Sequence, residues 1–308
     1  MQMRAVQLSL LFLIGVFTPT AVYASPLHRA ASSGNLKEVK RLLKDGADIE
    51  SRFDWGKTPL LTAAAAGKLT IIKELLARGA NLHARDRLSD TALHIAAAED
   101  RTEVIKFLLK RGMKLKIQSS RRQTALHTAA YFDRVNAARL LLARGMPVDI
   151  RDLSGKTPLH VAARRNSPAV AKLLIERGAN IRARMQLRWT PLHMAAVGKC
   201  VECMKVLIAR GADVDARTKH GEVPLYWIRS IAGARLLLKH GARVNVASRL
   251  NGITPLHMAV AKNRFDIVRL LRSAGANPHA RDHFRKRPVD YCKLKKNVKA
   301  CRDALKRK

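Results

Sequence analysis

The stretch Thr157-Pro158-Leu159-His160 decides the fold, because close copies of it recur along the chain. The copies begin at residues 25, 58, 91, 124, 157, 190, 223 and 254, so the interval is 33 residues six times and then 31. A glycine lies 21 positions after seven of these starts and 18 positions after Val223. Two features that stay in step over eight copies identify an internal repeat of one supersecondary unit.

The residues of one unit predict two helices and a turn. Threonine is a good N-cap, and proline at the first helical position gives up an N–H that would be unpaired anyway. A second helix is indicated by leucine runs such as residues 140–142, and it ends at the glycine, which tolerates the left-handed conformation that follows a helix. A polar segment then turns back to the next unit. One such pair cannot bury its apolar face alone, so the units must stack.

The Thr-Pro-Leu-His-x-Ala motif and the 33-residue period resemble the ankyrin-repeat family from residue 25 to the end of the chain. The resemblance implies an all-α solenoid of helix pairs with short hairpin-like fingers, which binds through its fingertips and concave helix faces. We expect one elongated domain of repeats over residues 25–286. The shortened unit at Val223 predicts shortened helices or a tightened loop. Residues 287–308 begin a ninth, partial unit, which suits a basic C-terminal cap.

The N-terminus has the pattern of a signal peptide. Arg4 gives a positive start, residues 8–17 are apolar, and small residues at positions 22 and 24 predict cleavage after Ala24. The apolar run is too short for a membrane anchor, which needs about 20 residues, and no later stretch is long and apolar enough to span. We therefore expect residues 1–24 to be removed and the protein to be secreted or periplasmic.

Positive charge dominates the composition. The chain has 59 Lys and Arg against 23 Asp and Glu, a formal net charge of +36. Such a balance favours anionic partners and says nothing about the fold. The surplus extends over the whole chain, is denser in the fingers, and is strong in the last residues.

The histidines do not indicate catalysis. Six of eleven fill the fourth motif position, and a position that repeats is architectural. In the ankyrin family it makes hydrogen bonds between neighbouring repeats. The other five lack metal-ligand spacing, and the sequence has no phosphate loop, nucleophile elbow or paired-carboxylate motif. We expect neither enzymatic activity nor a cofactor nor a bound metal.

Four cysteines can pair in three ways. In a regular stack Cys200 and Cys203 lie about three repeats, or roughly 25–30 Å, from Cys292 and Cys301, whereas a disulfide needs Cα atoms within about 7 Å. Only Cys200–Cys203 and Cys292–Cys301 are then possible. The first would bridge the turn between two helices and the second would hold the C-terminal cap. Free thiols are the main alternative, and a redox-active Cys200-Val201-Glu202-Cys203 motif is a minor one.

Two sets of residues are candidates for partner binding. A row of arginines stands 27 positions after the repeat starts, and these cations should line up at the finger bases: Arg52, Arg85, Arg151, Arg184, Arg217 and Arg281. The third repeat has Gln118 instead, and Arg249 is nearby in the seventh. A patch in the middle of the stack combines aromatic residues with arginine, as interface hot spots do: Tyr131, Phe132, Arg164, Arg165 and Trp189, with Met185 and Leu187. Solvated or locally paired side chains are the alternative for the row, and packing between repeats for the patch.

Two functions are compatible with these features. The first is a non-enzymatic interaction scaffold outside the cytoplasm, which binds an acidic protein through fingers and concave face. The second is a binder of anionic polymers or surfaces, such as nucleic acid, polysaccharide or anionic lipid. An exported effector that acts in a host cell is a variant of the first.

Overall fold

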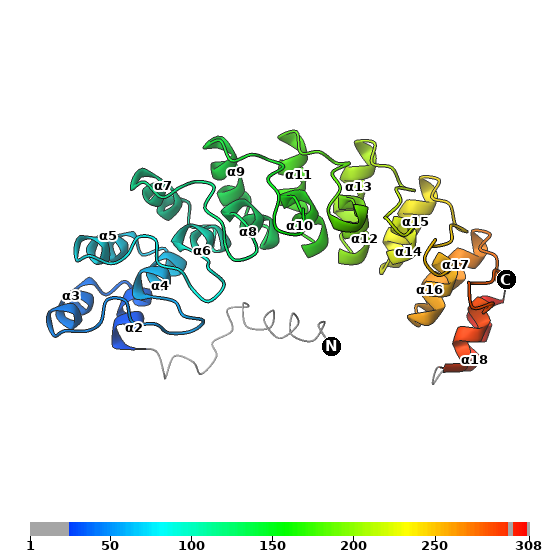
Figure 1. Ribbon diagram of the computed structural model, residues 1–308, viewed down its shortest axis with the longest axis horizontal. Coiled ribbons are helices and arrows are strands. Elements are labelled where there is room, and N and C mark those ends of the chain that lie inside the picture. Colours follow the sequence, from blue (N-terminus) through cyan, green and yellow to red (C-terminus); the bar gives the residue numbers. More distant parts are fainter. Residues whose placement is uncertain (1–24, 295–297, 307–308) are drawn as a thin grey trace. The chain divides into compact units, whose positions relative to one another are not determined.

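The computed structural model describes residues 25–294 and 298–306, and within them the chain is helical, with one isolated β-bridge between Phe53 and Lys57 and no strand (Figure 1). The predicted signal peptide, residues 1–24, lies outside the described residues. Contacts divide the chain into two compact units, Met1–Ala92 and Leu93–Lys308. Each unit is described by itself.

Every repeat contributes a pair of helices, as the sequence predicts. The pairs of unit 1 are α2 (Pro26–Ser33) with α3 (Leu36–Lys44), and α4 (Pro59–Ala66) with α5 (Leu69–Ala77). The helices that follow are α6 (Ala92–Ala98), α7 (Thr102–Lys110), α8 (Ala125–Tyr131), α9 (Val135–Ala143), α10 (Pro158–Arg165), α11 (Pro168–Glu176), α12 (Pro191–Gly198), α13 (Val201–Ala209), α14 (Pro224–Trp227), α15 (Ile231–Lys239), α16 (Pro255–Ala261) and α17 (Phe265–Ser273). In unit 2 the first helices of the pairs lie side by side in one row, here called the inner row, and the second helices form an outer row (Figure 1).

The helices begin and end where the repeat motif predicts. Thr157 is the extended N-cap of α10, and Pro158 is its first helical residue. The outer helix α11 ends at Glu176 with Arg177 as its C-cap, and Gly178 then adopts a left-handed φ of 83°. That conformation costs glycine little and other residues more, which explains the glycine row.

Small and large side chains divide the packing between the two rows. The inner helices carry fully buried alanines such as Ala130, Ala163 and Ala196, which let neighbouring backbones approach closely. The outer helices carry fully buried leucines such as Leu141 and Leu174. Burying one such leucine stabilises the fold by about 1.5–3 kcal/mol. The core therefore lies between the two rows, where these leucines and alanines are buried.

The seventh repeat is shortened in its first helix, which confirms one form of the prediction. α14 has four residues, whereas α15 keeps the nine residues of a normal outer helix. The chain leaves the helix at Ile228, whose side chain is only 2% exposed. A Cβ on Gly233 would lie 2.8 Å from Ile228 Cδ1 and 3.1 Å from Met204 Sδ, so the missing turn is filled by Ile228 packed over a glycine.

A different structure closes the C-terminal end of unit 2. The 3₁₀ segment η3 (Pro288–Leu294) packs on α16, and α18 (Val298–Leu305) packs on α17. Arg272 Nε donates to the carbonyl of Leu305 over 2.8 Å, and Ala304 is buried. In the described part of the chain, no helix has both the length and the apolar character that a bilayer crossing requires.

Candidate functional site

The motif histidines connect each repeat to the next finger, the turn segment between two repeats. In unit 2, His127 Nε2 contacts the carbonyl of Lys156 at 3.1 Å, and His160 Nε2 contacts that of Trp189 at 3.2 Å. Equivalent contacts are made by His94, His193 and His257 in unit 2 and by His28 in unit 1. A carbonyl only accepts, so Nε2 carries the proton. The structural role that the family resemblance implies is the observed one.

The other ring nitrogen fixes the histidines in the neutral form. The backbone N–H of Thr157 donates to His160 Nδ1 over 3.2 Å, so a second proton on the ring would face a donor. The rings of His160 and His193 are fully buried. Burial lowers the pKa of each to about 4, which outweighs the hydrogen bonds that raise it. These rings are unsuited to proton transfer near neutral pH.

The finger arginines form the ladder that the sequence predicts, but in two separate runs. In unit 2, Arg151 Nη1 donates to the carbonyl of Gly155 in its own finger over 3.0 Å and to the carbonyl of Arg184 in the next over 2.8 Å. Arg184 Nη1 then reaches the carbonyl of Arg217 over 3.2 Å. Arg52 and Arg85 repeat the contact in unit 1 over 2.7 Å. One nitrogen of each donor thus holds neighbouring fingers together.

The seventh finger interrupts the ladder. The backbone pairs Ser248 with Ile253, where the sixth finger pairs Thr218 with Glu222, so the seventh finger holds one extra residue. This register puts Ala247, not Arg249, at the ladder position. Arg217 makes no side-chain hydrogen bond within the described residues, neither to its own finger nor to the next.

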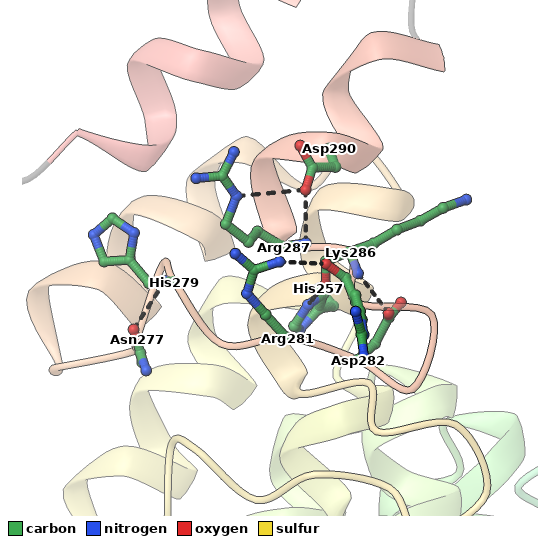
Figure 2. Close-up of polar contacts among 9 residues, drawn as sticks. His257, Asn277, His279, Arg281, Asp282, Lys286, Arg287 and Asp290 are labelled. Atoms are coloured by element: carbon green, nitrogen blue, oxygen red, sulfur yellow. Dashed lines mark hydrogen bonds and ion pairs between the residues drawn. The ribbon is translucent and has the colours of Figure 1, made fainter.

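The last member of the row lies in the eighth finger. Among the residues that the structure describes, Arg281 Nη1 donates only within its own turn, to the carbonyl of Arg285 over 3.1 Å. Figure 2 shows this finger, in which Asp282 accepts the backbone N–H of Lys286 and Asp290 contacts Arg287. The finger is held by its own polar contacts and continues into η3.

Exposed apolar side chains gather at the fingertips, and the sequence reasoning missed most of them. The large hydrophobic residues that are more than a third exposed in the described chain all lie in fingers: Trp55, Leu88, Leu153, Leu187, Leu250 and Phe284. Phe284 is 72% exposed, and each of the six has an arginine within three residues in the sequence. The signal was available as an apolar residue inside an otherwise polar turn, with no helix face to pack on.

The patch in the middle of the stack is partly assembled. The guanidinium carbon of Arg165 lies 3.7 Å from the centre of the Tyr131 ring, and Phe132 packs edge-on against that ring at 4.7 Å. Burial raises the pKa of Tyr131, although Arg165 and Arg164 oppose the shift. Trp189 packs instead against Trp227 at 5.0 Å, in the shortened repeat. The indole N–H of Trp227 is buried and without a hydrogen-bond partner in the described structure.

The cysteines form the two pairs left open by the stack geometry. Sulfur–sulfur distances are 2.01 Å for Cys200–Cys203 and 2.00 Å for Cys292–Cys301. The first bond does not bridge two helices as expected. Cys200 is the N-cap of α13 and Cys203 stands in its first turn, so the bond closes the start of one helix. The second connects η3 to α18. All four cysteines are fully buried.

Comparison with known proteins agrees with this architecture. The family model "Ankyrin repeats (3 copies)" matches residues 27–119, 93–185, 147–218 and 182–247, and the model "Ankyrin repeat" matches residues 251–283. The crystal structure of the human ASB11 ankyrin repeat domain superposes with a TM-score of 0.63 and 27% identity, over 71% of this chain and 99% of that one.

Among curated proteins, the 85/88 kDa calcium-independent phospholipases A2 of rat and mouse are each 45% identical over 53 residues. That match spans 17% of this chain but only 6% of either phospholipase. In the described residues no cluster of His, Cys, Asp and Glu could hold a metal ion. An array of ankyrin repeats is a protein-interaction scaffold and is typically not an enzyme. The chain belongs to the ankyrin-repeat family.

Proposed function

We propose that this chain is a non-enzymatic scaffold that acts outside the cytoplasm and binds an acidic partner protein through its fingers and the inner-row face. The observation that carries the proposal is the coincidence of exposed apolar side chains and arginines at the fingertips. Isolated exposed apolar residues need no explanation, but their confinement to equivalent turns does. Protein interfaces join an apolar centre to surrounding arginines, whereas a polyanion offers little apolar surface to match.

The ladder arginines support binding as well as structure. Arg151 and Arg184 each donate from one η nitrogen to backbone carbonyl groups, and neither contacts a carboxylate among the described residues. A guanidinium has five N–H donors, so most of them stay available for a partner's carboxylates. The ladder also holds neighbouring fingers in register, which presents these donors in a fixed arrangement.

Location outside the cytoplasm is supported by the disulfides. Two disulfide bonds in one chain are typical of oxidising compartments. The signal-peptide pattern at residues 1–24 points the same way.

The test is a pull-down with the chain lacking residues 1–24 as bait, eluted with rising salt, followed by an affinity measurement on the acidic protein that elutes. Arg217→Ala is the informative variant, because the Arg217 side chain makes no hydrogen bond in the described structure that the substitution would remove. Arg210→Ala, in the same repeat but at an exposed helix end, is the matched control. We expect Arg217→Ala to weaken binding at least fivefold and Arg210→Ala less than twofold. Equal effects of both would contradict binding through the fingers.

The second candidate, a binder of anionic polymers, is favoured by the net charge of +36. It predicts a steep, log-linear loss of affinity with salt, because each neutralised phosphate releases a counterion. An apolar fingertip interface predicts a shallow dependence. A log–log slope steeper than about −5 between roughly 50 and 300 mM NaCl would favour the polymer over the protein.

A further inference from the structure

Four arginines stand where inner-row helices of unit 2 end, and Arg229 is close enough to repel both Arg164 and Arg264. Arg164 and Arg165 close α10, Arg229 follows the shortened α14, and Arg264 stands in the turn between α16 and α17. We call them the inner-row arginine cluster. Arg164 and Arg229 are exposed, and Arg165 and Arg264 are half-buried.

Two close contacts shape the surface on which these arginines lie. Gly198 ends α12 without a side chain, and a Cβ there would lie 2.5 Å from the carbonyl oxygens of both Ala163 and Arg164. The end of α12 therefore lies directly against the end of α10. On the other side, Arg264 Nη1 donates to the carbonyl of Ile228 over 2.6 Å, which ties it next to Arg229.

The cluster carries more positive charge than the nearby carboxylates neutralise. No ion pair involves its four members among the described residues, and the only close partner of the Arg165 guanidinium is the Tyr131 ring. Burial, Arg229 and Arg165 lower the pKa of Arg164, and burial and Arg229 lower that of Arg264. Asp266 opposes the shift at Arg264, and no carboxylate opposes the shift at Arg164. The arginines thus repel one another in the free protein, and an anion would relieve that repulsion.

We propose that the inner-row arginine cluster binds closely spaced carboxylates in an acidic segment of a partner protein. The proposal rests on the function proposed above and names the anchoring point of that partner. Guanidinium groups bind carboxylates through two parallel N–H···O bonds, and Arg164 and Arg229 have no competing hydrogen bond in the described structure.

A polypeptide fits this surface better than a nucleic acid. Binding to single strands depends on aromatic faces on which bases stack. Here Arg165 lies over the Tyr131 ring, and Trp227 packs between Trp189 and Tyr226, with ring centres 5.0 and 5.1 Å away. The aromatic side chains near the cluster are engaged by the protein itself, so charge is what it offers a ligand.

The experiment measures binding of a capped hexaglutamate peptide to the chain without residues 1–24, by calorimetry and tryptophan emission at low salt. Trp227 lies two residues from Arg229 and serves as a reporter. The test variant is Arg164→Ala with Arg229→Ala. The matched control is Arg144→Ala with Arg177→Ala, which removes the same charge from exposed ends of α9 and α11. A hexaglutamine peptide and a six-residue oligothymidylate are the ligand controls.

We expect hexaglutamate to bind, its Kd to rise at least tenfold in the test variant and less than threefold in the control, and hexaglutamine not to bind. Replacing Arg164 and Arg229 by lysine keeps the charge but removes the paired N–H donors of the guanidinium, so it should give an intermediate Kd. This variant also shows whether the effect of the alanine variant comes from misfolding. Equal weakening in both double variants, or no hexaglutamate binding, would overturn the proposal that the cluster binds carboxylates. The pull-down could still identify an acidic partner in that case, so the two proposals fail separately. Tighter, cluster-dependent binding of oligothymidylate would overturn the choice of a protein segment.

Discussion

The buried histidines of the repeat motif make the stability of this protein depend on pH. The folded protein holds His160 and His193 neutral down to a pKa of about 4, while the unfolded chain protonates them near the ordinary value of 6.5. Between these values the unfolded state binds more protons, so stability is complete above pH 6.5 and is lost as the pH falls towards 4. We expect a loss of about 2 kcal/mol per ring at pH 5, measured by urea unfolding at pH 7 and pH 5.

His160→Gln is the variant that isolates the effect. It removes one titrating ring, so the difference between its unfolding free energies at pH 7 and pH 5 should be smaller than in the parent. Asp90 in unit 1 acts in the opposite direction, because burial and Asp86 raise its pKa to about 7. For that reason the comparison is made between parent and variant. An unchanged pH dependence in the variant would show that the ring does not titrate in the unfolding transition.

Two helical glycines test how closely the inner row is packed. At Gly198 a Cβ would meet backbone oxygens at 2.5 Å, which cannot move without shifting a helix. At Gly233 it would meet the end of the Ile228 side chain, which can move. Both substitutions to alanine gain about 1 kcal/mol of helix propensity. We expect Gly198→Ala to destabilise unit 2 by roughly 1–3 kcal/mol and Gly233→Ala to be near neutral, measured by thermal and urea unfolding. A tolerated Gly198→Ala would mean that α10 and α12 lie farther apart.

At the scale of elements, the repeat motif predicts the helices and the ladder but not the exceptions. Thr157 and Pro158 announce α10 because capping is local, and the position of Arg151 in the ladder follows from register alone. The direction of Arg151, towards the carbonyl of Arg184, depends on the next finger and cannot be read from one repeat. The three residues missing between Val223 and Gly241 shift the register of the seventh repeat, so a count of 27 positions from the repeat start pointed near Arg249 although the ladder position belongs to Ala247.

The same contrast holds for the candidate site. The sequence identified the pairing of Tyr131 with Arg165, since both stand at equivalent helix ends in successive repeats. It did not identify the cluster with Arg229 and Arg264, because that proximity depends on the shortened α14 and on the missing side chain of Gly198. Three-dimensional closeness between residues of the fifth, seventh and eighth repeats is not encoded in any local motif.

The C-terminal element depends on its disulfide. α18 has eight residues, too few for a stable isolated helix, and Cys292–Cys301 ties it to η3. We expect Cys292→Ala with Cys301→Ala to lower the stability of this end by about 2–3 kcal/mol and to remove hydrogen-exchange protection from the amides of α18. In Cys200→Ala with Cys203→Ala, α13 keeps its neighbours on both sides, so protection of α18 should be unchanged. Full protection of α18 without its disulfide would contradict this role.

At the scale of the whole molecule, cations outnumber the carboxylates that could neutralise them. The chain has 59 Lys and Arg but 23 Asp and Glu. The ion pairs of the described part are mostly between residues three or four apart in the sequence, and several lie on exposed helix faces, such as Lys205 with Glu202 and Lys106 with Glu103. Such pairs contribute about 0.3–0.5 kcal/mol each, less than the repulsion of a surplus this large. An acidic partner would therefore stabilise the scaffold as well as bind it.

Salt should stabilise this protein in the absence of a partner. Screening weakens repulsion between unpaired cations more than it weakens the few exposed pairs, because the Debye length falls from about 30 Å at 0.01 M to about 8 Å at 0.15 M. We expect Tm to rise by several degrees over that range in NaCl. In the variant Arg144→Glu with Arg177→Glu the net charge falls by four, so the rise should be smaller. Sodium sulfate at equal ionic strength separates screening from specific anion binding at the inner-row arginine cluster. Screening alone gives the same Tm in sulfate as in chloride. Specific binding gives a higher Tm in sulfate, and Arg164→Ala with Arg229→Ala abolishes that difference. A Tm that falls with NaCl would mean that ion pairs outweigh repulsion, and the case for an acidic partner would lose its electrostatic basis.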